Sequence, residues 1–234
     1  MRRSVLVTGG NRGIGLAIAR GFLERGDRVA VAHRGSEAPE GALGIKCDVS
    51  VSEEVGRAFE LAREEHGPVE VLVANAGVSD DMFLMGMKDE QFRRVLDTNL
   101  GGAFYAARCA YPDMVGLRRG RMIFVSSVAG LRGSEGQANY AASKAGMVGL
   151  ARSLARELGR RNVTVNVVAP GLVDTDMTSD LPEPHRKRIL DDTPLARPGT
   201  TAEVAAAVLW LASEEAGYVT GAVLPVDGGL GMGH

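Results

Sequence analysis

Strand-like apolar runs and helical segments alternate along almost the whole of this 234-residue chain. Each expected strand is short and rich in β-branched residues, and a segment with apolar residues at helical spacing follows it. Seven strands are expected, at residues 4–8, 28–33, 44–49, 69–77, 121–130, 162–171 and 221–229. Strands that alternate with helices run parallel, because each helix returns the chain to the same edge of the sheet. The sequence therefore predicts an α/β fold, a doubly wound parallel sheet with helices on both faces.

Composition limits the number of domains and the class of partner. A chain of this length that is 45% hydrophobic fits a single domain over residues 1–234, although two small domains would also fit. Its formal net charge of −2 gives no reason to expect nucleic acid as a partner. Cys47 and Cys109 lack metal-ligand spacing, so we expect no metal and interpret both as buried thiols in a reducing cytoplasm. The N-terminal apolar run is too short to export or anchor the chain, so no membrane is expected.

A glycine-rich segment, GGNRGIG, follows the first expected strand and begins the next helix. Gly9, Gly13 and Gly15 let the backbone turn tightly and approach a ligand, while the first N–H groups of the helix would face a diphosphate. The spacing is G-x-x-x-G-x-G, not the more familiar G-x-G-x-x-G. A plain turn before a helix also uses glycine. The segment therefore indicates a dinucleotide site only in combination with its neighbours.

Residues near the end of the second expected strand indicate which dinucleotide would bind. An NAD site usually has an acidic residue there for the ribose 2′-hydroxyl, whereas this chain has His33 and Arg34, with Arg12 in the glycine-rich segment. Guanidinium groups would hold a 2′-phosphate that a carboxylate would repel, so we expect NADPH. The alternative is that both arginines are merely solvated. Asp48 is expected either to accept a hydrogen bond from the adenine amino group or to cap the turn before the helix that begins near Ser52.

Loops at the carboxyl ends of the strands carry most of the other candidate residues. Ligands bind at this edge of an open α/β sheet, so residues 9–15, 75–77, Ser127 and 170–171 should meet at one crevice. Residues 174–198 are polar and contain four prolines, and we expect them to form a lid over the pocket.

Tyr140 and Lys144 lie four residues apart in a stretch, residues 137–159, that is expected to be one long helix. Their side chains would share a helix face, and the lysine ammonium would lower the pKa of the phenol toward working pH. A phenol in that state is a usable general acid. The alternative is coincidence. Asn99 begins a glycine-rich segment inside a helical pattern, where we expect a kink, and its side chain would bond either freed backbone groups or an ordered water.

These segments occur in the order and separation typical of the short-chain dehydrogenase/reductase family, which the chain resembles along nearly its whole length. The resemblance rests on TGGNRGIG, NAG, Asn99, Ser127 thirteen residues before Tyr140, Tyr140-x-x-x-Lys144 and PG. The stretches GQANYAASKAG, VNVVAPG and VTGAVLPVDGG are most similar to those of the 3-oxoacyl-[acyl carrier protein] reductases of bacterial fatty acid synthesis. The resemblance implies a Rossmann fold and NADPH-dependent reduction of 3-oxoacyl-[acyl carrier protein]. Two alternatives are another dehydrogenase of the family, acting on a sterol, polyol or xenobiotic ketone, and a non-catalytic nucleotide-binding regulator.

The resemblance also implies a role for each site residue. Ser127 would hydrogen-bond the substrate carbonyl oxygen and Tyr140 would donate the proton. Lys144 would hold the nicotinamide ribose and lower the pKa of Tyr140, while Asn99 would position a water through which Lys144 is reprotonated. The other implied cofactor contacts are Gly9, Asn11, Arg12, Gly13, Ile14, Gly15, Arg34, Asp48, Val49, Asn75, Ala76, Gly77, Pro170, Gly171, Val173 and Thr175.

The implied partners are an acyl carrier protein and further copies of the chain. An acidic carrier needs a local basic surface near the pocket mouth, and two arginine pairs, Arg118–Arg119 and Arg160–Arg161, precede adjacent expected strands. Arginines at helix ends also satisfy carbonyls and the helix dipole, which is the alternative. Helices around residues 103–114 and 141–158 carry apolar residues on more than one face, as in relatives that form homotetramers.

Overall fold

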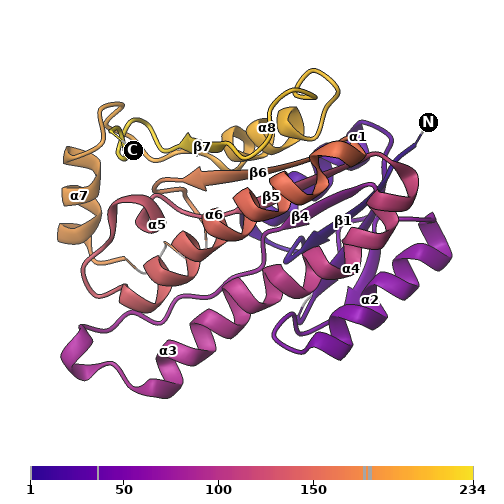
Figure 1. The fold of residues 1–234 in the computed structure, drawn as a ribbon. Coiled ribbons are helices and arrows are strands. Elements are labelled where there is room, and N and C mark those ends of the chain that lie inside the picture. Colours follow the sequence, from indigo (N-terminus) through magenta and orange to yellow (C-terminus); the bar gives the residue numbers. More distant parts are fainter. Residues whose placement is uncertain (1, 36, 176–177, 179–180, 234) are drawn as a thin grey trace.

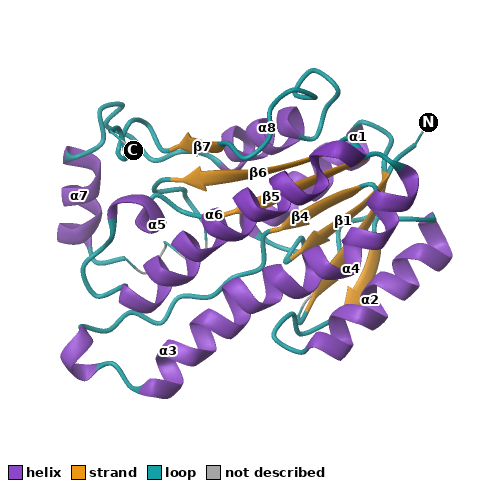
Figure 2. Ribbon diagram, viewed as in Figure 1, coloured by secondary structure: helices purple, strands orange, loops and turns teal. Residues whose placement is uncertain are grey.

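The computed structural model describes residues 2–35, 37–175, 178 and 181–233, and these residues form the predicted α/β architecture (Figures 1 and 2). Within them, seven parallel strands make one sheet in the order β3-β2-β1-β4-β5-β6-β7. The strands are β1 (Ser4–Thr8), β2 (Arg28–His33), β3 (Leu43–Lys46), β4 (Val71–Ala74), β5 (Gly120–Val125), β6 (Val163–Pro170) and β7 (Val223–Val226). The α-helices are α1 (Gly13–Glu24), α2 (Ser52–His66), α3 (Asp89–Leu96), α4 (Gly102–Leu117), α5 (Ala129–Arg132), α6 (Ala138–Leu158), α7 (Glu183–Asp191) and α8 (Thr201–Leu211). Shorter turns are the 3-10 segments η1 (Leu84–Gly86) and η3 (Gly159–Arg161) and the π-helical segment η2 (Asp97–Gly101).

Helices cover both faces of the sheet, which explains why its strands are continuously apolar rather than alternating. Helices α2, α4 and α6 pack on one face, where Phe59, Phe124 and Met147 are fully buried. Helices α1 and α8 pack on the other face, around Phe22 and Val208. Burial of each large apolar side chain contributes about 1.5–3 kcal/mol relative to exposure, so the two cores fix which helices flank the central strands.

The element boundaries differ from expectation at a few places, each for a local reason. The fifth strand ends at Val125 instead of continuing to residue 130, because the chain turns there into α5. Helix α8 is capped by Thr200, the residue immediately before its first turn. The Thr200 hydroxyl accepts a hydrogen bond from the Glu203 N–H at 3.2 Å, and Glu203 accepts one from the Thr200 N–H at 2.8 Å, which is a capping box. Pro225 lies in β7, an edge strand, where a residue without a backbone N–H is tolerated.

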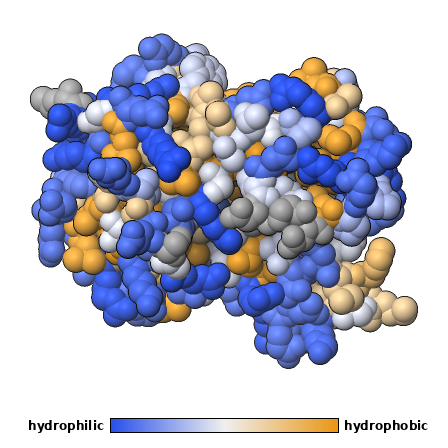
Figure 3. All heavy atoms as spheres, turned by 180° about the vertical axis from the view of Figure 1, so that it is seen from behind, coloured by the Kyte–Doolittle hydropathy of each residue, from blue (hydrophilic) through white to orange (hydrophobic). Residues whose placement is uncertain are grey.

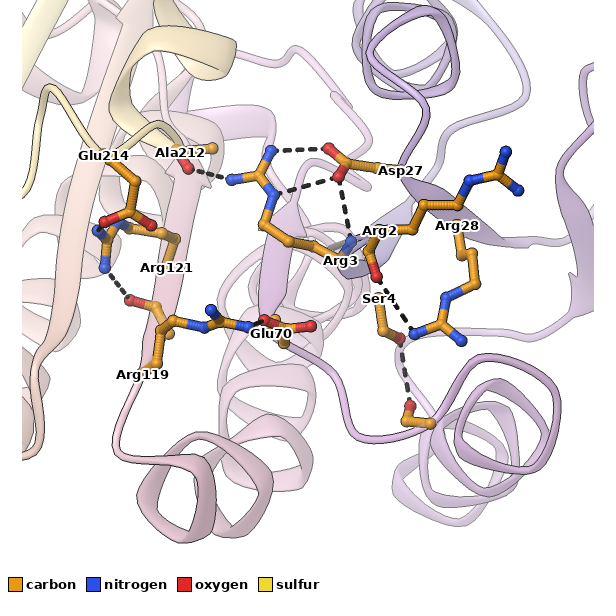
Figure 4. A network of polar contacts seen from close by, with 12 residues as sticks. Arg2, Arg3, Ser4, Asp27, Arg28, Glu70, Arg119, Arg121, Ala212 and Glu214 are labelled. Carbon is orange, nitrogen blue, oxygen red and sulfur yellow. Dashed lines mark hydrogen bonds and ion pairs between the residues drawn. The ribbon is translucent and has the colours of Figure 1, made fainter.

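The amino edge of the sheet carries a network of ion pairs (Figure 4). Arg3 pairs with Asp27 at 2.7 Å and also donates to the carbonyl oxygen of Ala212. Arg119, just before β5, pairs with Glu70, just before β4. Such pairs hold successive elements in register at this edge, although each contributes little stability because its members are partly solvated.

One apolar segment lies outside both cores. Residues 82–85, in the connection between β4 and α3, include Phe83, Leu84 and Met85, which are 70%, 77% and 102% exposed. Figure 3 shows apolar atoms protruding at the lower right, where this connection lies when the view of Figure 1 is turned. Among the described residues, no helix combines the length and apolar character that crossing a bilayer requires.

We expect Gly15→Ala to destabilise the protein by about 1–3 kcal/mol, the cost of forcing extra atoms into a packed site. A Cβ at this position would overlap the carbonyl oxygen of Gly9 and lie 2.5 Å from Asn75 Nδ2. Gly56→Ala in α2 is the matched control. Its Cβ would meet nothing within 4 Å, so it should stabilise by about 0.5–1 kcal/mol through helix propensity. Urea unfolding measures both, and equal effects of the two substitutions would contradict the close packing at Gly15.

Candidate active site

The carboxyl ends of the strands surround a cleft of about 500 Å³. Loops that follow six of the strands, together with α6, contribute its walls, as the crevice rule predicted. The predicted residues that line it are Gly9, Asn11, Arg12, Gly13, Ile14, Gly15, Arg34, Val49, Asn75, Ala76, Gly77, Ser127, Tyr140, Lys144, Pro170, Gly171, Val173 and Thr175. Asp48 and Asn99 are predicted site residues that do not line it.

The glycine-rich segment provides a backbone surface suited to an anion. Gly9 and Gly13 adopt φ values of +65° and +53°, which other residues rarely reach. Arg12 is the N-cap of α1, but its side chain makes no capping hydrogen bond. The first turn of α1, all of which the structure describes, contains no acidic residue. The N–H groups of that turn and the helix dipole therefore favour a bound diphosphate. A Cβ on Gly9 would come within 3.0 Å of Ala76, so the segment also needs glycine to lie against the loop after β4.

Asn75 fixes the loop after β4 to the loop after β1. Its amide Nδ2 donates to the carbonyl oxygens of Thr8 and Gly9, both at 3.1 Å. The backbone N–H groups of Asn75 and Ala76 donate in return to the Thr8 hydroxyl, at 3.0 and 3.1 Å. These four bonds hold the two loops at a constant separation across the cleft.

Asp48 has the capping role that was one of its two expected roles. Its Oδ1 accepts from the Ser50 N–H at 3.0 Å and from the Ser50 hydroxyl at 2.7 Å. Its Oδ2 pairs with Arg34 Nη1 at 3.4 Å. Partial burial raises the pKa of Asp48, but the Ser50 hydrogen bonds and the Arg34 charge outweigh burial and lower it overall. Asp48 thus holds Arg34, whose side chain remains 57% exposed, at the rim of the cleft.

Tyr140 and Lys144 lie on one face of α6, beside the end of β5, as predicted. Lys144 Nζ donates to the carbonyl oxygen of Val125 at 2.8 Å and lies 5.6 Å from the centroid of the Tyr140 ring. Burial lowers the pKa of Lys144 from 10.5 to about 8. Ser127 follows the same strand and shares a hydrogen bond with Tyr140. A hydroxyl, a phenol and an ammonium therefore converge at one end of the cleft.

The expected lowering of the Tyr140 pKa is wrong for this structure. Burial raises the pKa of the phenol, the hydrogen bond with Ser127 lowers it, and the Asp81 carboxylate raises it further, so that the net direction is upward. Removing a phenolate from water costs more than the neighbouring groups return. Tyr140 therefore keeps its proton until a stronger base forms beside it.

Asn99 lies in the π-helical segment η2, which interrupts the regular α-helical turns between α3 and α4 at the position where a kink was predicted. Its fully buried side chain donates to the Val78 carbonyl oxygen at 3.0 Å and accepts from the Val78 N–H at 2.8 Å. It also donates to the Ser143 hydroxyl at 3.0 Å. The Asn99 side chain thus bonds backbone groups of the loop after β4, not groups freed at the interruption of its own helix. A Cβ on Gly77 would lie 3.2 Å from Asn99 Oδ1 and 3.3 Å from Lys144 Nζ, so the two side chains do approach the same point.

Two positioning residues were missed by sequence reasoning. Ser126 Oγ donates to the backbone oxygen of Lys144 at 2.8 Å and ties α6 to the end of β5. Ser126 also follows the carboxyl end of β5, the feature by which Ser127 was selected from the sequence. Asn139 is fully buried, accepts from the Tyr140 N–H at 2.7 Å and donates to the Asp80 oxygen at 2.9 Å. No sequence signal separated Asn139 from an ordinary helix residue, because its partner is 59 positions away.

The structure brings the two arginine pairs together but not to the cleft. Arg118 and Arg119 precede β5 and Arg160 and Arg161 precede β6, and the first residues of these strands, Gly120 and Val163, are register partners. Both pairs therefore lie at the amino edge of the sheet, whereas the cleft is at the carboxyl edge. The expected position near the pocket mouth is wrong within a single chain.

The expected lid is described only in part. It contains α7 and the loop to Gly199, and Thr175 lies against the glycine-rich segment, with Cγ2 3.5 Å from the position of a Cβ on Gly13. Residues 176–177 and 179–180 of the expected lid lie outside the described residues.

Comparison with known proteins gives matches along nearly the whole chain. The family described as enoyl-(acyl carrier protein) reductase matches residues 9–231. The chain is 59% identical over 232 residues to the 3-oxoacyl-[acyl-carrier-protein] reductase MabA of Mycobacterium tuberculosis, covering 99% of this chain and 94% of the relative. It is 44% identical over 235 residues to the 3-oxoacyl-[acyl-carrier-protein] reductase FabG of Escherichia coli, covering 97% and 96%. The corresponding reductase of Chlamydia muridarum is 40% identical over 242 residues, covering 98% of both chains.

We expect Lys144→Met to raise the free energy of unfolding by about 2 kcal/mol at pH 7. The fall in the pKa of Lys144 from 10.5 to about 8 means that folding destabilises its charged form by roughly 3 kcal/mol. The substitution removes this cost, but it also removes the hydrogen bond to Val125, which contributes about 1 kcal/mol. The folded protein releases this proton near pH 8 and the unfolded chain near pH 10.5, so wild-type stability rises with pH between these values. The advantage of Lys144→Met should therefore shrink over that interval.

Denaturant unfolding from pH 7 to pH 10 measures this difference, with substitution of the exposed Lys46 by Met as the control. A Lys144→Met protein that is less stable than wild type at pH 7 would contradict the burial of a strained charge.

Proposed function

The chain belongs to the short-chain dehydrogenase/reductase family, and we propose that it reduces 3-oxoacyl-[acyl carrier protein] to 3-hydroxyacyl-[acyl carrier protein] with NADPH. The observation that carries this function is the grouping of Ser127, Tyr140 and Lys144 at the end of β5. The relatives named above as 3-oxoacyl-[acyl-carrier-protein] reductases, 40–59% identical over nearly the full chain, support the choice of substrate. The reaction would serve fatty acid synthesis of the bacterial type in the cytoplasm.

The residues of the cleft fit NADPH. The first turn of α1 would hold the diphosphate, Arg12 and Arg34 the 2′-phosphate, and Lys144 the nicotinamide ribose. Bound there, NADPH supplies the hydride that reduces the ketone carbon. The remaining cofactor contacts would come from the lining residues at positions 9–15, 49, 75–77, 170–171, 173 and 175.

The hydroxyl groups of Ser127 and Tyr140 would deliver the proton to the substrate. Ser127 Oγ donates a hydrogen bond to the ketone oxygen and orients it toward Tyr140. Tyr140 transfers its proton as negative charge develops on that oxygen. The raised pKa of Tyr140 suits this order, because an alkoxide is a stronger base than the phenolate left behind. Lys144, buried and within 5.6 Å of the ring, stabilises that phenolate. Asn99 shares the space around Gly77 with Lys144, and we propose that it positions the water that reprotonates the lysine.

The family description names enoyl reduction, and that reaction is the second candidate. Reduction of a 2-enoyl thioester places hydride on C3 and needs no proton donor at a C3 oxygen. The relatives named 3-oxoacyl-[acyl-carrier-protein] reductases favour the ketone as substrate. Parallel assays with acetoacetyl and crotonyl thioesters distinguish the two reactions.

The larger assembly is also part of the proposal. We propose a single domain with residues 174–198 as its substrate lid, assembled into a homotetramer in which α4 and α6 meet between subunits. A basic surface formed by Arg118, Arg119, Arg160 and Arg161 would bind the acidic carrier. Arg119 already pairs with Glu70, whereas Arg118, Arg160 and Arg161 have no ion pair among the described residues. These three charges are therefore available to a partner.

NADPH should be preferred over NADH by at least about tenfold in kcat/KM, since ~1.4 kcal/mol of charge-assisted bonding to the 2′-phosphate supplies that ratio. Arg34→Asp should abolish or reverse the preference, while the exposed Arg20→Asp on α1 should leave it intact. Steady-state rates on an acetoacetyl thioester measure the ratio. Equal rates with both cofactors in the wild type would contradict the assignment of Arg34.

Tyr140→Phe should lower kcat by about 10²-fold or more while NADPH affinity changes little, because the ring is kept and only the proton donor is removed. Fluorescence titration of NADPH accompanies the turnover assay. The control is Tyr218→Phe in the loop before β7, a fully exposed position that should keep wild-type turnover. Near-normal turnover by Tyr140→Phe would refute the proposed general acid.

A further inference from the structure

Asp81 is held beside the helix that carries Tyr140, although it belongs to a different element. It lies in the connection between β4 and α3, and its Oδ2 accepts a hydrogen bond from Gln137 Nε2 at 2.8 Å. Gln137 is the N-cap residue of α6, and Tyr140 lies in the first turn of that helix. The Asp81 carboxylate is therefore fixed at the end of α6 that carries the phenol.

We propose that Asp81 acts on the reaction through Tyr140, because its carboxylate disfavours the phenolate and so keeps the proton on the donor until the substrate oxygen accepts it. Asp81 does not line the cleft, so it is a positioning residue for this proton and not a catalytic residue. The inference rests on the proposed function, since it concerns the proton donor of that reaction.

The loop that carries Asp81 is attached to the start of α6 on both sides of this residue. The Asp80 backbone oxygen accepts from Asn139 Nδ2 at 2.9 Å, and Asn139 is fully buried. The Met82 N–H donates to the Gly136 oxygen at 2.7 Å. Three successive residues of the loop thus bond to the same short stretch of chain. A shift of Asp81 away from α6 would break these bonds together, so its distance from the phenol is constrained.

The side chains of the two adjacent aspartates have different partners. Asp80 Oδ1 accepts from Gln91 Nε2 at 2.8 Å and its Oδ2 pairs with Arg94, and both of these partners are on α3. A guanidinium therefore offsets the charge of Asp80. Asp81 bonds to the Gln137 amide and to the Ser79 hydroxyl, which are neutral, and has no ion pair within the described parts of the chain. Its charge is thus free to act on the start of α6.

The other charges around Tyr140 oppose Asp81 or are offset. Lys144 Nζ lies 5.6 Å from the centroid of the Tyr140 ring, and a cation there favours the phenolate, whereas a carboxylate favours the neutral phenol. The first turn of α6 contains no acidic residue of its own. The neighbouring elements α3, α5, α7 and η2 carry the ion pairs Arg94–Asp80, Arg132–Asp192 and Arg188–Glu135, and the solvent-exposed Asp97.

The pKa of Tyr140 agrees with this balance. Burial raises it, the hydrogen bond with Ser127 lowers it, and the Asp81 carboxylate raises it. Lys144, with a pKa of about 8, has lost its charge before the phenol titrates, so Asp81 is then the charge that acts on the ring. Removal of the Asp81 charge should therefore lower the pH at which Tyr140 loses its proton. A role of Asp81 in folding alone would leave that pH unchanged.

Tyrosinate absorbance as a function of pH tests the inference on the full chain without nucleotide. Subtraction of the Tyr140→Phe titration from that of wild type isolates Tyr140, and the same subtraction is made in an Asp81→Asn background. Asparagine keeps an oxygen that can accept from Gln137 and loses only the charge. We expect the Tyr140 titration to move to lower pH, with about threefold more tyrosinate at a fixed pH below the midpoint, the effect of one solvent-exposed charge.

The pH dependence of the reverse reaction provides a second measurement. Oxidation of 3-hydroxybutyryl-CoA with NADP⁺ uses the phenolate as base, so its rise with pH should move in the same direction in Asp81→Asn. The KM for NADP⁺ should change by less than about twofold, because Asp81 does not line the cleft. Asp81→Glu retains the charge and should keep the wild-type titration.

Asp80→Asn is the matched control, since it makes the same charge change one residue away and its side chain bonds to α3. It should leave the Tyr140 titration unchanged. Gln137→Lys is an independent variant that leaves Asp81 in place and offsets its charge, so it should move the titration in the same direction as Asp81→Asn.

Two results would overturn the inference. One is a Tyr140 titration that stays at its wild-type position in Asp81→Asn, or in Gln137→Lys if Asp81→Asn does not fold. The other is an equal shift in Asp80→Asn, which would mean that any charge on this loop has the effect. Failure of the proposed function would appear differently, as a wild-type enzyme that reduces no acetoacetyl thioester with NADPH, whereas the titration requires no turnover.

Discussion

The hydrogen bond from Lys144 Nζ to the carbonyl oxygen of Val125 is the contact on which the site depends. It joins the helix that carries the phenol to the end of the strand that carries Ser127. Ser126 adds a second bond between the same elements, from its hydroxyl to the Lys144 backbone oxygen. With the helix and strand fixed in this way, the Tyr140 side chain can vary little in its position relative to Ser127. A general acid needs that constancy, because proton transfer requires hydrogen-bond distance.

Burial gives this arrangement its chemistry at some cost to stability. The same removal from water lowers the pKa of Lys144 to about 8 and raises the pKa of Tyr140. The lysine thus remains largely cationic near neutral pH, and the phenol remains protonated until substrate charge develops. An exposed pair would have the same two protonation states at neutral pH, so burial changes the free-energy cost of the lysine charge and not its sign. The two apolar cores, built on large side chains such as Phe124 and Phe22, supply the stability that tolerates such a site.

The parallel sheet divides the molecule into two chemically different edges. The carboxyl edge presents glycine-rich turns, hydroxyls and helix N-termini, which suit anions and a developing oxyanion. The amino edge presents arginines, of which Arg3 and Arg119 are used internally and Arg118 and Arg161 are not paired among the described residues. The two edges therefore offer different chemistry, anion-binding groups at one and unpaired guanidinium groups at the other.

Local sequence determined the elements, the sheet and most of the cleft, because periodicity and turn chemistry act over short distances. The apolar runs defined seven strands, and the glycines at positions 9, 13 and 15 defined the turn into α1. Because ligands bind at the carboxyl ends of parallel strands, residues 9–15, 75–77 and Ser127 could be placed at one edge. Tertiary structure decided what depends on distant neighbours. Burial, not the adjacent lysine, set the direction of the Tyr140 pKa; Val78 and Ser143 took up the side chain of Asn99; and Asp80 selected Asn139 as a partner across 59 residues. The arginine pairs were recognisable in the sequence, but the edge on which they lie follows only from the direction of the strands that they precede.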